Sequence, residues 1–99
     1  VSESMSVLRN KLAKKLYETG ILYMKMDEFE PARMSFNQVL DLYYDTDIIE
    51  NIHYEIIKSY LKQGNDKKAR SHWINKAIDS IKQEKLVLEL TEVFSQKEI

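Results

Sequence analysis

The chain repeats one pattern of small and aromatic residues at a fixed offset of 37 positions. The corresponding pairs are Tyr23 and Tyr60, Ala32 and Ala69, and Phe36 and Trp73. In each copy an aromatic residue precedes an alanine by nine positions, and a large aromatic residue follows that alanine by four. We interpret the alanine as the point where two helices of a hairpin cross most closely. Such a unit cannot bury its apolar face alone, so neighbouring units have to stack.

Apolar residues recur at spacings of three and four along most of the chain, which is the period of an amphipathic α-helix. This spacing predicts five helices, at about 5–26, 28–44, 48–63, 66–83 and 84–96. We expect Asp27 to be the N-cap of the second helix and Gly64 to end the third. Because no stretch alternates with a period of two, the predicted fold class is all-α, built from antiparallel helical hairpins with short connections.

Composition narrows the possible functions. Two glycines and one proline among 99 residues argue against an all-β fold and against disorder. The net charge of −1 lacks the basic excess of a nucleic-acid-binding protein, although residues 51–83 carry seven basic and three acidic groups. The absence of cysteine excludes disulfides and zinc–cysteine sites. No apolar run approaches the roughly 20 residues that span a bilayer, so we expect no membrane insertion of this segment.

The repeated positions resemble the tetratricopeptide repeat (TPR), a helical hairpin of about 34 residues with small, aromatic and alanine anchors at this spacing. The anchors are Gly20, Tyr23, Phe29, Ala32 and Phe36 in the first copy, and Tyr60, Ala69 and Trp73 in the second. Ile57 and Asp66 depart from the pattern. The resemblance implies one domain over residues 1–99, stacked as a right-handed solenoid. It places repeat one at about 13–46, repeat two at about 50–83 and a C-terminal capping helix at about 84–96.

A narrower resemblance lies in the run from Leu8 to Gly20 and in the Leu22 to Lys25 stretch that follows. This region resembles the C-terminal half of BamD-type lipoproteins, which are TPR components of the machinery that assembles outer-membrane β-barrels. Tyr44 stands where that family prefers proline. The resemblance implies a protein–protein interaction scaffold whose partners are other outer-membrane assembly factors. It also implies the periplasmic face of a bacterial outer membrane, reached through a lipid anchor outside this segment.

Two other interpretations stay open. The chain could be a cytoplasmic TPR adaptor that binds peptide segments. It could instead be a structural module that associates with a second copy of itself through the last predicted helix, by way of Leu86, Leu90, Val93 and Phe94.

The TPR resemblance also implies a binding surface, because in that family the first helix of each hairpin lines a concave groove. Transferred by repeat position, the groove residues are Lys14, Tyr17, Ile21, Met24 and Lys25, then Asn51, Tyr54, Lys58, Leu61 and Lys62. Tyrosines, aliphatic side chains and four lysines suit an extended segment with apolar and acidic residues. Alternatively, several of these side chains pack against a neighbouring repeat or the chain ends.

No residue pattern supports catalysis. A Gly-rich phosphate loop is absent. His53 and His72 lie nineteen positions apart on different predicted helices, and neither has a histidine at i+4, so we predict no metal site. We expect His53 in a packing position and His72 on the outer face. The sequence therefore predicts no enzyme activity and no cofactor.

Overall fold

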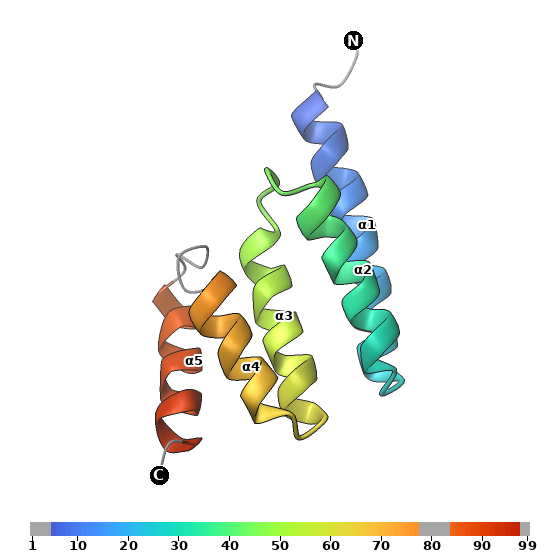
Figure 1. The fold of residues 1–99 in the computed structure, drawn as a ribbon. Coiled ribbons are helices and arrows are strands. Elements are labelled where there is room, and N and C mark those ends of the chain that lie inside the picture. The colour runs from blue at the N-terminus through green and yellow to red at the C-terminus, as the bar shows by residue number, and fades with distance from the viewer. Residues whose placement is uncertain (1–4, 78–83, 98–99) are drawn as a thin grey trace.

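The computed structural model describes residues 5–77 and 84–97, and it is all-helical in these ranges. The elements are α1 (Met5–Lys25), α2 (Phe29–Leu42), α3 (Ile49–Lys62), α4 (Asp66–His72), a π-helical segment η1 (Trp73–Ala77) and α5 (Glu84–Lys97). They follow one another across an elongated body of 56 × 28 × 19 Å, in which α1 packs on α2, α2 on α3, and α3 on α4 (Figure 1). The all-α prediction is confirmed for these residues.

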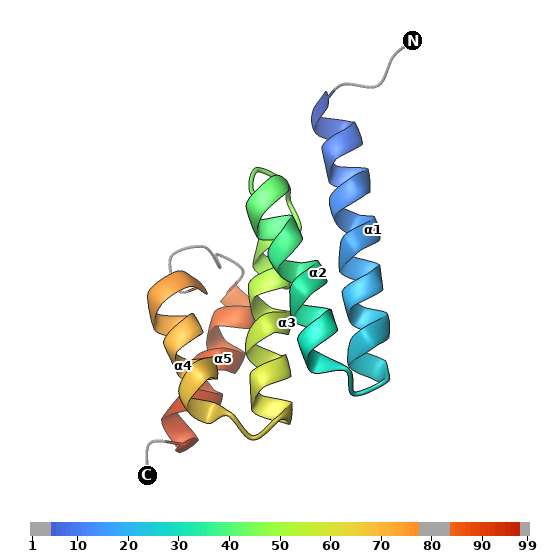
Figure 2. The ribbon, with the colours of Figure 1, turned by 45° about the vertical axis from the view of Figure 1, so that its right-hand side comes forward.

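The first hairpin consists of α1 and α2, which run antiparallel (Figure 2). Asp27 adopts a left-handed conformation with φ of 59° and ends α1. Beyond it, the Glu28 N–H donates to the Tyr23 carbonyl at 2.9 Å, which is the 6→1 bond of a Schellman motif. The N-cap expectation for Asp27 is therefore wrong, because Glu28 holds the N-cap position and makes no side-chain cap bond. The short Asp side chain instead tolerates the left-handed turn.

The second hairpin, α3 and α4, closes in the same way 37 residues later. Gly64 has φ of 78°, and the Asn65 N–H donates to the Tyr60 carbonyl at 2.8 Å. Here the N-cap is complete, since the Asn65 side chain accepts from the Lys68 N–H at 3.2 Å. The offset of 37 seen in the sequence is therefore also an offset between equivalent backbone hydrogen bonds.

The core of the first hairpin is built around Phe36, which is fully buried on α2. Ala13 and Ala32 are also fully buried, and Met24 and Ile52 extend this cluster toward α3. Gly20 faces the Phe36 ring so closely that an added Cβ would come within 3.0 Å of three ring atoms. A small residue at position 20 is therefore a steric requirement of this crossing.

The second hairpin buries Ile57, Ala69 and Trp73 together with Leu90 of α5. Val87 packs against this cluster from the same helix, so α5 covers one side of the hairpin. Of the other residues named for self-association, Val93 is half-buried. The side chains of Leu86 and Phe94 and the expected end of the fourth helix at 78–83 lie outside the described residues.

The fourth helix differs from its expected course. Regular α-helix ends at His72, and the next five residues form a π-helical turn. In the first hairpin the corresponding positions of α2 stay α-helical through Leu42. The helical backbone of the two hairpins therefore differs over Trp73–Ala77.

Candidate functional site

A groove lies between the first helices of the two hairpins. It encloses a cavity of about 300 Å³ lined by residues of α1 and α3, namely Ile21, Met24, Lys25, Glu55, Lys58 and Lys62. Five of these six residues are among the ten that repeat position predicts. The structure thus brings together half of the predicted set, at the place where equivalent helices face each other.

The charge of this groove is mainly positive. Lys25 and Lys62 are exposed and Lys58 is half-buried. Glu55 supplies the only carboxyl group of the lining. Burial raises the pKa of Glu55, and the charges of Lys58 and Lys62 only partly oppose this effect. Three ammonium groups beside two apolar side chains form a surface that attracts an anionic, partly apolar ligand.

The remaining predicted residues take other positions. Tyr17 packs into the core, with its ring centroid 6.2 Å from that of Phe36, and burial raises its pKa, as does the charge of Glu55. Tyr54 and Leu61 pack against the second cluster, which consists of Ile57, Ala69, Trp73 and Leu90. Neither residue lines the cavity between α1 and α3.

Two more predicted residues lie away from the cavity. Lys14 is exposed and lines a separate hollow of about 420 Å³ near the α2–α3 connection. That connection is tied to α1 by Arg9, which donates to the Asp45 carboxylate and to the Leu42 carbonyl. Asn51 is half-buried at the start of α3 and does not line the cavity.

Glu55 is the groove residue that repeat position missed. It precedes Lys58 by three positions and Lys62 by seven, which places all three on one face of α3. This spacing is visible in the sequence and could have identified it.

The two histidines meet between α3 and α4. His53 Nδ1 lies 2.9 Å from His72 Nε2, so one ring donates a hydrogen bond to the other. The packing position expected for His53 is confirmed by its burial, whereas the outer-face position expected for His72 is wrong, because its ring turns inward to His53. Burial and the neighbouring His53 lower the pKa of His72 to about 4, and burial and Lys76 lower that of His53. Both shifts favour the neutral form of the ring.

In the described ranges, no group of three or more His, Asp or Glu side chains is placed to hold a metal ion. Among the same residues, no helix has both the length and the apolar character needed to cross a bilayer. Comparison of the chain with protein families, with curated proteins and with solved structures finds no match.

Proposed function

We propose that this chain is a non-catalytic scaffold for protein–protein interaction that binds an extended, acidic and partly apolar segment of a partner in the groove between α1 and α3. The observation that carries the proposal is that three lysines and two apolar residues line one cavity, namely Lys25, Lys58, Lys62, Ile21 and Met24. Lysine ammonium groups pair with carboxylates, while methionine and the lysine stems adapt to apolar side chains of different shape.

A TPR-type arrangement, with hairpins stacked as a right-handed solenoid, is part of this proposal. Its support is the equivalence of the two hairpin turns at Asp27 and Gly64, and the burial of Ala32 and Ala69 at equivalent positions. A helical array of this kind offers an extended surface to peptides because each hairpin presents the same face.

The experiment is a display selection of random peptides against the whole chain. We expect the enriched peptides to combine Asp or Glu with aliphatic or aromatic residues. Replacing two groove lysines, in the variant Lys58→Glu with Lys62→Glu, should weaken binding of these peptides by about tenfold or more, because two attractive charges become repulsive. The matched control is Lys67→Glu, since Lys67 is exposed on α4 and outside the groove. Enrichment without acidic residues, or equal losses in variant and control, would refute the proposal.

The narrower proposal of a BamD-like role in outer-membrane β-barrel assembly rests on the sequence run from Leu8 to Lys25. It predicts that the chain co-purifies with a barrel-bearing assembly factor from detergent-solubilised bacterial outer membranes. Recovery of cytosolic proteins alone would favour the cytoplasmic adaptor. A dimer in light scattering at micromolar concentration would favour the self-associating module.

A further inference from the structure

One face of α1 is largely apolar, and no other helix of the described residues covers it. Its members follow one another at alternating spacings of four and three positions, namely Leu8, Leu12, Lys15, Thr19, Leu22 and Met26. This alternation is the 3.5-residue period of a coiled-coil contact. The four apolar members are between 41% and 57% exposed, and the two polar members at the centre are exposed as well. We call these six residues the α1 seam.

The α1 seam lies on a different side of the helix from the core and the groove. The buried residues of α1 are Ala13, Gly20 and Met24, and none of them belongs to the seam. The groove cavity uses Ile21, Met24 and Lys25 of α1, which are also outside the seam. In Figure 2, α1 forms one edge of the molecule, with α2 and α3 both to one side of it. A partner on the seam therefore leaves the groove open.

The 37-residue repeat shows what kind of surface the seam is. On α3, the residues 37 positions after Lys15 and Thr19 are Ile52 and Ile56, and both are buried in the core cluster that includes α2. With this face, α3 packs against the hairpin that precedes it. The same face of α1 has no hairpin before it in the part of the chain that the structure describes. The seam is therefore a place where a further helix continues the packing of the array.

The polar centre of the seam selects the partner. A wholly apolar helix would bury the Lys15 ammonium group without a counter-charge, which is costly. A second copy of α1 that runs antiparallel avoids this cost. In that arrangement Lys15 faces Thr19 of the second copy, and the apolar members face one another on both sides of this polar layer. Leu8 then faces Met26 and Leu12 faces Leu22, because all three pairs are centred on position 17.

The charges beside the seam fit the same arrangement. Glu18 follows Lys15 by three positions, and within residues 5–77 and 84–97 neither side chain forms an ion pair. In the antiparallel arrangement, Glu18 of one copy lies about 1.5 Å along the axis from Lys15 of the other, which is the rise of one residue. Two Lys15–Glu18 pairs then form between the copies. A parallel arrangement would instead place Lys15 against Lys15, so charge favours the antiparallel one.

We propose that the chain forms a two-fold symmetric homodimer by antiparallel pairing of the α1 seams of two copies. The contact leaves both grooves open, so the dimer offers two equivalent binding sites to a partner with repeated segments. It differs from self-association through α5, which uses another surface.

The first test is sedimentation equilibrium of the whole chain from low micromolar to submillimolar concentration. We expect a reversible monomer–dimer equilibrium. Leu12→Glu with Leu22→Glu should weaken the dimer at least tenfold, because four carboxylates would then enter the contact. Circular dichroism should stay unchanged, since both leucines are exposed in the single chain. The matched control, Leu42→Glu with Leu88→Glu, changes two exposed leucines of α2 and α5 and should dimerise as the parent does.

The second test exchanges charges between copies. Lys15→Glu alone and Glu18→Lys alone should each weaken the homodimer by about threefold or more, because like charges then meet across the contact. An equimolar mixture of the two variants should associate at least as tightly as the parent, since the mixed dimer restores opposite charges.

The third test concerns orientation. Because the chain has no cysteine, Leu12→Cys and Leu22→Cys chains can be mixed and oxidised, and the antiparallel pairing predicts disulfides mainly between the two different variants. A chain that stays monomeric throughout, a control that dissociates as far as the seam variant, a mixture no tighter than its components, or disulfides mainly within one variant would each overturn the proposal.

Discussion

The contact between Gly20 and Phe36 gives the sharpest test of the packing, because two effects of one methyl group have opposite signs. In the interior of α1, Gly20→Ala should raise stability by about 1 kcal/mol through helix propensity alone. Against this, the new Cβ would come within 3.0 Å of three atoms of the Phe36 ring. That ring is fully buried, and close-packed interiors leave little space for a ring to shift. Overpacking of this kind costs typically 1–3 kcal/mol.

We therefore expect a net loss of up to about 2 kcal/mol. Each kcal/mol lowers the melting temperature of a chain of this size by about 4–8 °C. The measurement is urea and thermal unfolding followed by circular dichroism. Thr19→Ala, at the exposed neighbouring position, is the control and should change stability by less than about 0.5 kcal/mol.

A double-mutant cycle assigns the effect to the ring. Phe36→Leu removes Cε1 and Cζ, the two ring atoms nearest the new methyl group, so Gly20→Ala in that background should be neutral or stabilising. The coupling energy should be about 1–3 kcal/mol. If Gly20→Ala alone raises stability, or if the two changes are additive, the close crossing of α1 and α2 is not the reason for a small residue at position 20.

Three further predictions concern the hairpin turns, the histidine pair and the groove. Gly64→Ala should lower the free energy of unfolding by about 1 kcal/mol, because φ of 78° disfavours any Cβ although space is open there. Asp27→Gly should raise that free energy by up to about 1 kcal/mol, because glycine adopts the left-handed conformation without strain. Urea midpoints measure both changes, and effects of the same sign would contradict the equivalence of the two turns. Because the pKa of His72 is about 4 in the folded chain against 6.5 in the unfolded one, the unfolded chain binds the proton first as pH falls. The free energy of unfolding should thus drop between pH 6.5 and 4 by at most about 3.4 kcal/mol. Solvent screening of the half-buried ring reduces the expected drop to about 1–2 kcal/mol. The variant His72→Gln should lose this part of the pH dependence, and a stability profile unchanged by the substitution would refute the assignment to His72. Glu55→Gln removes the carboxyl group that competes for the groove lysines, so acidic peptides should bind a few-fold tighter by fluorescence anisotropy, whereas unchanged affinity would place their charges elsewhere.

Local sequence patterns were sufficient for most of the fold. The expected bounds of the first three helices and of the last lie within one or two residues of α1, α2, α3 and α5. These helices are amphipathic, and their ends carry turn residues such as Gly64. The π-helical turn at Trp73–Ala77 could not be predicted, since no Gly or Pro marks it and its stretch has the same apolar spacing as a regular helix.

The repeat offset found half of the groove because equivalent helices present equivalent faces to each other. It did not separate out Tyr54 and Leu61, which pack against the second hydrophobic cluster and do not line the cavity. It also placed His72 outside, since the pairing with His53 depends on a contact between two helices whose relative rotation no local pattern encodes. Sequence identifies which residues share a helix face, and packing decides which face another helix covers.

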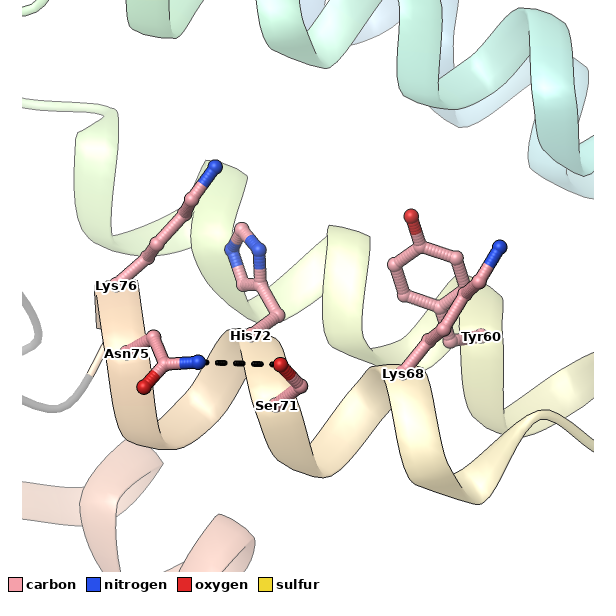
Figure 3. A pocket seen from close by; sticks show the side chains of 6 residues that line it. All are labelled: Tyr60, Lys68, Ser71, His72, Asn75 and Lys76. Carbon is pink, nitrogen blue, oxygen red and sulfur yellow. Dashed lines mark hydrogen bonds between the residues drawn. The ribbon is translucent and has the colours of Figure 1, made fainter.

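The π-helical turn explains how the second hairpin can carry a polar hollow between α3 and α4 without losing its core (Figure 3). A π-turn holds an i→i+5 hydrogen bond in place of i→i+4, so side chains after it are rotated relative to an uninterrupted α-helix. In the first hairpin, α-helical throughout, Val39 is fully buried. At the equivalent position Lys76 lies within the π-turn and is exposed beside His72. Trp73, the first residue of the turn, stays in the core as Phe36 does. The backbone change thus begins at Trp73, the last anchor that this hairpin buries, and Asn75 and Lys76 within the turn line the hollow between α3 and α4.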